Sequence, residues 1–254
     1  MVQLAETTVL ESQDLEKNKI IVALDVDSTD QAIDLVEQLK GSVAGFKVGL
    51  ELVNAVGVDI FGRLQAAGAD RIFYDAKLHD IPNTVAGACR MAARHGLWMI
   101  NVHASGGSRM ISAAADALAT ASERAGVQTP LLIAVTLLTS ISEQELHDEL
   151  RVALSPPKYV VDLARLAQDA GAKGVVACPH EIAAVRTACG PDFLIVTPGV
   201  RPAGSDHGDQ RRVMTPREAV ALGASHLVIG RPITASSDPA EAARQIALDI
   251  SAAD

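Results

Sequence analysis

Short apolar segments recur all along the chain, and segments with helical patterns separate them. Each apolar segment is five to eight residues long, which is a typical length for a β-strand. The pattern therefore predicts eight strands, at residues 19–26, 45–49, 71–78, 98–105, 131–138, 174–179, 193–200 and 226–233.

Helix start and stop signals fall between these strands. Polar residues stand at the spacing of an N-terminal helix cap in four places: Ser28 with Gln31, Ser142 with Glu145, Thr215 with Glu218, and Asp238 with Glu241 behind Pro239. Glycines stand where helices should end, at Gly41, Gly68, Gly96, Gly126, Gly171, Gly190 and Gly223. The repeating unit is therefore a strand, a loop and a helix.

Eight such units without a linker predict a single (β/α)8 TIM barrel over residues 19–254, preceded by a polar lead-in at residues 1–18. A doubly wound sheet is less favoured, because no GxGxxG turn follows the first strand. Two segments exceed the basic unit: 139–157, which carries an inserted helix, and 201–214, a polar stretch whose glycines predict a mobile loop.

The composition narrows the class of protein. A net charge of −9 argues against general attraction to nucleic acid or an anionic membrane, so an anionic ligand needs a local basic cluster. No apolar segment reaches the roughly 18 residues of a membrane helix, and the N-terminus lacks the pattern of a secretory signal. The cysteines Cys89, Cys178 and Cys189 are odd in number and lack metal-ligand spacing, which suits a reducing compartment. We expect a cytoplasmic protein.

Charged residues stand at the predicted carboxyl ends of several strands, where barrels of this class carry their chemistry. In RIFYDAKL the alternation of a strand puts Phe73, Asp75 and Lys77 on one face, opposite an apolar one. A purely structural interpretation of Asp75 and Lys77 is an ion pair that fills the top of the barrel. Buried charges are costly, however, and Asp25 and Lys47 extend the pair to a network of alternating sign, which favours a functional site.

Arg231 follows the last predicted strand, where such barrels often bind phosphate, although a solvated loop charge is the alternative. Arg201 and Gln210 on the preceding long segment can complete an anion clamp. His103 ends the fourth strand and is more typical of a hydrogen-bonded packing residue than of a catalyst. Because HExxH, paired ligands and a GxSxG elbow are all missing from the sequence, we expect chemistry without a metal or cofactor.

The motifs together resemble the orotidine 5′-phosphate decarboxylase family. They are ALDV at 23, FKVG at 46, YDAKLHDIPNT at 74, VTLLTS at 135, TPGVRP at 197, DQRRVMTP at 209 and VIGRPIT at 228. They run in order from the first strand to the last. The resemblance implies a cofactor-free homodimer that converts orotidine 5′-monophosphate to UMP and CO2, the last step of UMP biosynthesis.

The resemblance also implies roles for individual residues. Lys77 is similar to the family's proton donor, and Asp25, Lys47, Asp75 and Asp80 are similar to the rest of its charged network. Asp80 and Thr84 would then reach into the partner subunit's site. Thr136 resembles a pyrimidine contact, and the phosphate would be held by Arg201, Gln210, Gly230 and Arg231.

Two alternatives stay open on the sequence. One is a magnesium-dependent phosphosugar decarboxylase or synthase on the same framework, although such enzymes tend to carry an acidic metal ligand on the second strand, where this chain has Lys47. The other is a barrel that binds a nucleotide phosphate without catalysis, for which the full set of charges has no evident use.

Overall fold

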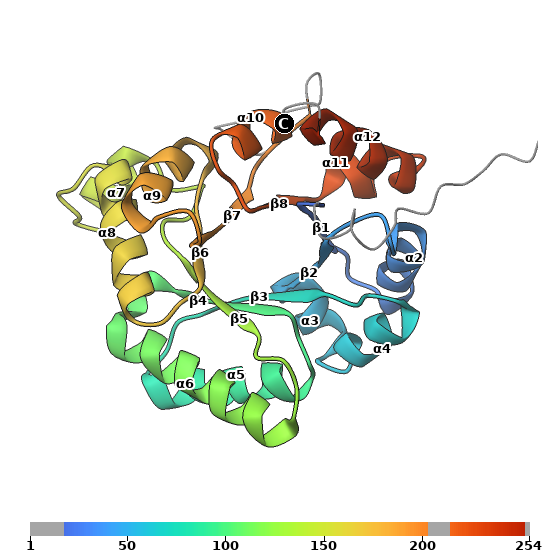
Figure 1. Cartoon of the computed structure of the whole chain (residues 1–254), viewed down its shortest axis with the longest axis horizontal. Helices are drawn as coiled ribbons and strands as arrows, with labels where there is room; N and C mark the ends of the chain where they lie inside the picture. The colour runs from blue at the N-terminus through green and yellow to red at the C-terminus, as the bar shows by residue number, and fades with distance from the viewer. Residues whose placement is uncertain (1–17, 203–213, 252–254) are drawn as a thin grey trace, which may run out of the picture.

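A computed structural model describes residues 18–202 and 214–251 and confirms the predicted architecture: eight parallel strands close into a barrel in chain order, with helices around it (Figure 1). Most of the lead-in lies outside the described residues. So does most of the 201–214 segment, including Gln210. The strands are β1 (Ile20–Ala23), β2 (Gly45–Gly49), β3 (Ile72–Leu78), β4 (Met99–His103), β5 (Leu131–Val135), β6 (Gly174–Val176), β7 (Leu194–Pro198) and β8 (His226–Ile229).

The helices lie between the strands and after the last one. They are α2 (Thr29–Leu39), α3 (Leu50–Val56), α4 (Ile60–Ala67), α5 (Pro82–Arg94), α6 (Ser108–Ala125), α7 (Glu143–Asp148), α8 (Pro156–Asp169), α9 (Ile182–Cys189), α10 (Pro216–Ala221), α11 (Arg231–Thr234) and α12 (Pro239–Ser251), with short 3-10 turns η1 (Ala104–Gly106) and η2 (Pro179–Glu181). The predicted inserted helix is α7, on the outer edge beside α8 and α9 in Figure 1.

The structure contains predicted caps at both ends of helices, and they explain where these helices begin and end. Ser142 with Glu145, and Thr215 with Glu218, form reciprocal capping boxes at α7 and α10. Ser28 accepts a hydrogen bond from the Gln31 amide, which begins α2. The predicted helix-ending glycines all have positive φ, in the region that glycine adopts without steric cost.

Several predicted strands are too long, because the chain leaves the sheet soon after passing the core. The clearest case is 226–233, where β8 ends at Ile229. Arg231 does not extend this strand but begins α11, in which Pro232 occupies the first turn, a position where proline needs no hydrogen-bond donor. The segments predicted at 19–26, 98–105, 131–138, 174–179 and 193–200 also end two to three residues early.

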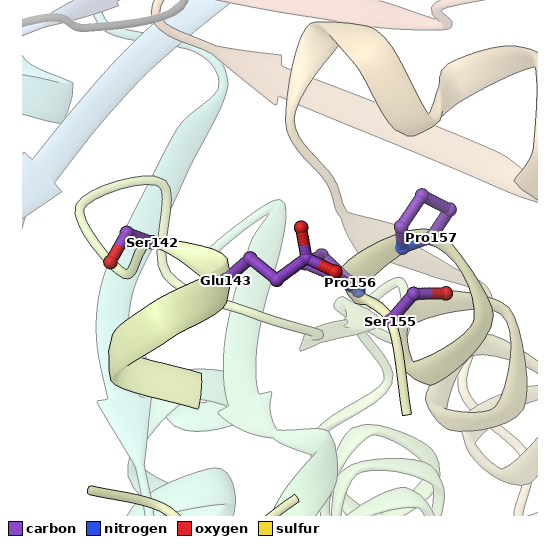
Figure 2. Close-up of a pocket in the computed structure, with 5 residues that line it drawn as sticks. All are labelled: Ser142, Glu143, Ser155, Pro156 and Pro157. Atoms are coloured by element: carbon purple, nitrogen blue, oxygen red, sulfur yellow. The ribbon is translucent and has the colours of Figure 1, made fainter. Parts of the chain in front are cut away.

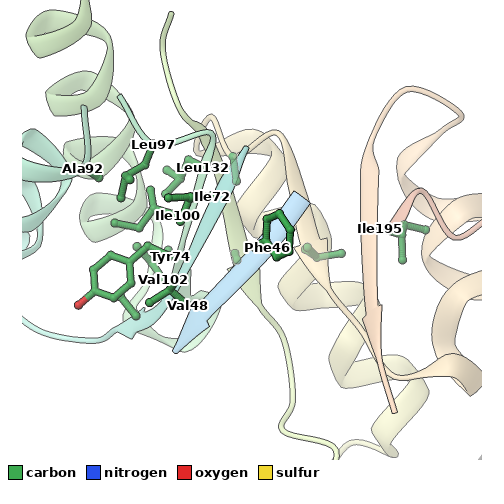
Figure 3. Packing of buried hydrophobic residues seen from close by; sticks show 14 of the residues in the cluster. Phe46, Val48, Ile72, Tyr74, Ala92, Leu97, Ile100, Val102, Leu132 and Ile195 are labelled. Carbon is green, nitrogen blue, oxygen red and sulfur yellow. The ribbon is translucent and has the colours of Figure 1, made fainter. Parts of the chain in front are cut away.

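The core has an outer and an inner layer. Between the strands and the helices, outward-facing residues such as Val48, Tyr74 and Ile100 pack against helix side chains (Figure 3). Inside the barrel a smaller cluster fills the lumen: Ile21, Ala23, Phe73, Met99, Ile133, Val196 and Val228, all buried. Two residues beyond Ala23, Phe73 and Met99 of this cluster the chain carries Asp25, Asp75 and Asn101, so the apolar cluster lies beneath polar side chains on this side of the barrel mouth.

None of the described helices is long and apolar enough to cross a membrane.

Candidate active site

The predicted alternating charges meet at the mouth of the barrel. The Lys47 ammonium lies 2.8 Å from an Asp25 carboxylate oxygen and 3.5 Å from Oδ2 of Asp75. The same Oδ2 lies 2.8 Å from the Lys77 ammonium. Three adjacent strands, β1, β2 and β3, therefore bring together a chain of charges in the order minus, plus, minus, plus.

The charges in this network differ in their access to solvent. The Asp75 side chain is only 13% exposed, whereas Lys77 is 34% exposed and so reaches toward solvent. Burial alone would raise the pKa of the Asp75 carboxyl, but the charges of Lys47 and Lys77 and hydrogen bonds from Lys77 and Asn101 hold this pKa below its ordinary value. Asp75 is therefore an anion at neutral pH.

Lys77 has an unusual backbone. Its φ is 47°, in the left-handed region, where a residue with a β-carbon loses about 1–2 kcal/mol relative to the right-handed region. The pairing of β3 with β4 also changes register here: Tyr74 pairs with Ile100, but Leu78 pairs with Val102. Four steps along β3 thus correspond to two along β4, and Asp75 and Lys77 lie within this irregularity. Such backbone strain often occurs at functional sites.

Asn101 is a site residue that the sequence reasoning missed. Its carboxamide on β4 donates a 2.7 Å hydrogen bond to Oδ1 of Asp75 and accepts one of 2.7 Å from the backbone amide of Lys77. The available signal was a polar amide in the middle of the apolar segment WMINVHAS, where a buried strand normally has none.

Asp80 and Thr84 do not join the network within one chain. Both are exposed, on the turn after β3 and in the first turn of α5, and the carboxylate of Asp80 accepts a hydrogen bond from the next backbone amide, that of Ile81. Ile81 between them is 68% exposed, a high value for such an apolar side chain. Their predicted role in a partner's site stays a prediction.

Thr136 and His103 lie at the carboxyl ends of β5 and β4. The Thr136 hydroxyl is buried and donates a 2.9 Å hydrogen bond to the carbonyl of Val176, which leaves its oxygen able to accept. His103 packs against the ring of His79, with 5.5 Å between ring centroids. Burial lowers the pKa of His103, and the charges of His79 and Lys77 add to this.

The predicted anion clamp lies after the last two strands. Arg201 is buried after β7 and donates to the carbonyl of Val200, whereas Arg231 is exposed at the start of α11. Val200 and Met214 form a parallel bridge, and the Arg201 amide donates to the Met214 carbonyl. Met214 therefore lies beside Val200 and Arg201, the residues that follow β7. Gly230 precedes Arg231, and a β-carbon there would come within 3.8 Å of Asp25.

A hollow lies at the insertion, between the starts of α7 and α8 (Figure 2). Its lining residues are Ser142, Glu143, Ser155, Pro156 and Pro157. Because this lining contains a carboxylate and no cation, the hollow is poorly suited to a phosphate. Among residues 18–202 and 214–251, no group of three or more His, Cys, Asp and Glu side chains could hold a metal ion.

A closed barrel with ionisable side chains gathered at the carboxyl ends of its strands defines the class of (β/α)8 barrel enzymes. A family model described as "Orotidine 5'-phosphate decarboxylase / HUMPS family" matches residues 18–246, and the chain belongs to this family.

Individual relatives agree with this assignment. The chain is 53% identical over 234 residues to orotidine 5′-phosphate decarboxylase of Moorella thermoacetica, with 92% of each chain covered. It is 48% identical over 233 residues to the protein of that name from Haemophilus influenzae Rd, covering 92% of this chain and 99% of the relative. A crystal structure of orotidine 5′-phosphate decarboxylase from Lactobacillus acidophilus is similar with a TM-score of 0.81 and 40% identity, over 92% of this chain and 99% of that one.

Proposed function

We propose that this protein decarboxylates orotidine 5′-monophosphate to UMP and CO2 without a cofactor, as the last step of de novo pyrimidine biosynthesis. The single observation that carries the proposal is the network of Asp25, Lys47, Asp75 and Lys77 at the barrel mouth, in a chain that belongs to the decarboxylase family.

The chemistry explains why a lysine is needed at this point. Loss of CO2 from C6 of the pyrimidine leaves an electron pair in the plane of the ring, where the ring π-system cannot delocalise it. Without a cofactor, the site must stabilise this carbanion with a nearby positive charge. The Lys77 ammonium supplies that charge and then donates the proton that replaces CO2 at C6.

The main role of Asp75 is to orient Lys77. Its Oδ2 lies 2.8 Å from the ammonium, and its lowered pKa keeps it ionised at neutral pH. A carboxylate at this place also repels the carboxylate of the substrate, and this repulsion is relieved as CO2 leaves. Lys47 lies between Asp25 and Asp75 and holds both anions in place.

Binding of the substrate phosphate supplies free energy at a distance from the reacting carbon. In this proposal the phosphate is held by Arg201, Gln210, Gly230 and Arg231, which follow β7 and β8 in the chain. Adjacent strands of a barrel bring such residues to one side of the mouth. Free energy from this remote contact can be used to order the site around the pyrimidine, where Thr136 accepts a hydrogen bond.

We further propose a cytoplasmic homodimer in which Asp80 and Thr84 complete the partner's site. The exposure of both residues, and of Ile81 between them, supports this arrangement, because in residues 18–202 and 214–251 neither side chain joins the charged network of its own subunit. Cys89, Cys178 and Cys189 all lie among the described residues and form no disulfide there, which fits a reducing compartment.

One assay tests the activity against the two alternatives. The ultraviolet absorbance of orotidine 5′-monophosphate is followed with purified protein in the presence of EDTA. Steady turnover is the expected result. Turnover of a sugar phosphate that requires added magnesium would support the phosphosugar enzyme instead, and binding of UMP without any turnover would support the non-catalytic barrel.

A further inference from the structure

The side chain of Asn101 is fully buried, at 0% exposure, in a strand that is otherwise apolar up to His103. It lies two residues beyond Met99, on the face of β4 that points into the barrel. A buried amide is costly unless both its donor and its acceptor find partners. At this position a purely structural residue would usually be apolar.

Both ends of the carboxamide have partners that determine its orientation. The backbone N–H of Lys77 can only donate, so it faces Oδ1 of Asn101 at 2.7 Å, and the Asp75 carboxylate can only accept, so it faces Nδ2 at 2.7 Å. This bond occupies Oδ1 of Asp75. Oδ2 is left for the ammonium groups of Lys77 and Lys47, at 2.8 and 3.5 Å.

The carboxamide also takes the place of a missing strand contact. Between Tyr74 and Leu78 the ladder with β4 is interrupted, and the side chain of Asn101 instead receives the amide of Lys77, whose φ is 47°. The same bond that satisfies the amide holds the left-handed turn. The direction in which Lys77 leaves the strand therefore depends on this amide group.

We propose that Asn101 is a positioning residue for the decarboxylation proposed above: it holds the Lys77 backbone and the Asp75 carboxylate in the arrangement that presents the Lys77 ammonium to the substrate. It has no contact with the reacting atoms in this role. The inference rests on the proposed function for its kinetic consequences, but its geometric content can be tested without activity.

The first test replaces Asn101 with alanine, which removes both hydrogen bonds. We expect kcat to fall on the order of 100-fold, the effect of a displacement of about 1 Å in a catalytic group, while the Kd of UMP changes less than about threefold because the phosphate is held elsewhere. The matched control is Val102→Ala, which also truncates a buried side chain of β4 but on its outward face, and which should leave kcat within about threefold.

A second variant separates positioning from packing by its pH profile. Asn101→Asp keeps the acceptor for the Lys77 amide but, when ionised, places a second carboxylate against Asp75. Like charges raise the pKa of such a pair, and one shared proton restores the missing donor. We expect kcat relative to wild type to rise as the pH is lowered from 8 to 5, roughly across the titration range of a raised carboxyl. Taking the ratio to wild type cancels the pH dependence that the two proteins share; the other charged or ionisable groups near Asp75 are Asp25, Lys47, Lys77 and His103.

A crystal structure of Asn101→Ala gives the readout that needs no activity. We expect φ of Lys77 to leave the left-handed region and its ammonium to separate from Oδ2 of Asp75. Unchanged Lys77 geometry, or kcat within threefold of wild type in both Asn101 variants, would overturn the inference. If wild type itself fails to turn over orotidine 5′-monophosphate, the proposed function falls, and the geometry in the crystal still decides the role of Asn101.

Discussion

At the scale of single residues, Lys77 combines two properties that are usually separate. Its ammonium is held 2.8 Å from Asp75 and yet a third of the side chain is exposed, so the charge is fixed in place without being enclosed by its own chain. An arriving substrate can therefore contact it directly. The cost of this placement is a left-handed backbone at a residue other than glycine.

We expect Lys77→Ala to lose kcat on the order of 1,000-fold, because a unit charge about 4 Å from the developing anion stabilises it by about 4 kcal/mol at an effective dielectric of 20. The Kd of UMP should change little, since product binding does not need the cation at C6. Steady-state kinetics and calorimetric titration give the two quantities. The matched control is Lys173→Ala, an exposed lysine just before β6 at the amino end of the barrel. Comparable kcat in Lys77→Ala and wild type would contradict the assignment.

Arg231→Ala should act differently, mainly through KM. A hydrogen bond between charged groups contributes about 1.5–3 kcal/mol, which corresponds to a rise of about 10- to 150-fold in KM. The control is Arg244→Ala, which removes an exposed arginine that is paired with Glu241 on α12. An unchanged KM for Arg231→Ala would place the phosphate elsewhere.

At the scale of elements, the amino ends of the strands carry aromatic packing in place of the charged network found at the carboxyl ends. Trp98 before β4 packs edge to face against His226 of β8, with 5.2 Å between ring centroids, and the Arg71 guanidinium lies 5.6 Å above the Trp98 ring. Within the part of the chain that the structure describes, the buried Nδ1 of His226 has no hydrogen-bond partner. Burial, reinforced by the charges of Arg71 and Lys19, lowers the pKa of His226 from 6.5 to about 4.

The buried His226 should make the stability of the fold depend on pH. Below pH 6.5 the unfolded chain binds a proton at His226 that the folded chain accepts only near pH 4, so the free energy of unfolding falls as the pH falls through this window. At pH 5 the loss is about 2 kcal/mol relative to pH 7. His226→Phe should reduce the difference in Tm between pH 7 and pH 5, at a fixed protein concentration. His180→Phe, at an exposed histidine, is the control and should keep the wild-type difference.

Close approach between strands gives a second test at this scale. A β-carbon on Gly174 of β6 would lie 2.4 Å from the carbonyl oxygen of Leu194 on β7, so Gly174→Ala forces the backbone apart and should destabilise the fold by about 1–3 kcal/mol. Gly62 within α4 has open space around it, and Gly62→Ala should instead stabilise by about 0.5–1 kcal/mol. Urea denaturation compares the two. Equal effects of the two changes would contradict this account of the contact between β6 and β7.

The sequence predicted the barrel because each unit repeats the same local signals: an apolar strand, a capped helix and a terminating glycine. The alternation also put Asp75 and Lys77 on one face of the strand, opposite an apolar face, and in the structure their charged groups lie 2.8 Å apart. The alternation of side chains could not reveal the change of register between β3 and β4, because that depends on a neighbouring strand 24 to 26 residues away along the chain. Asn101 was missed for the same reason, since an isolated amide has no local motif.

At the scale of the whole molecule, a chain of net charge −9 is proposed to bind an anionic nucleotide. An acidic chain can bind an anion because the fold gathers positive side chains at one rim of the barrel. These side chains lie at or near the carboxyl ends of strands: Lys47, Lys77, Arg201 and Arg231. The local field at that rim, rather than the overall charge, governs the approach of the substrate.

A shared site between two subunits predicts recovery on mixing. Lys77→Ala and Asp80→Ala dimers are each expected to be inactive, but a mixed dimer joins an intact Lys77 from one chain to an intact Asp80 from the other. Random exchange makes half of the dimers mixed, each with one good site, so activity should return to about a quarter of wild type. Mixing Lys77→Ala with Asp75→Ala is the control, because both residues serve their own chain's site and no intact site forms. Absence of recovery in the first mixture would contradict the shared site.

The change of register between β3 and β4 has a consequence for protein engineering. Because Tyr74 to Leu78 spans four steps against two on the neighbouring strand, the Asp-x-Lys segment does not fit into a regular parallel ladder. A designer who grafts Asp75 and Lys77 onto another barrel would need to transplant the additional length of β3 and the amide of Asn101 with them. The transferable module is therefore a pair of strands, and a graft of the three-residue motif alone should give a lysine that points in the wrong direction.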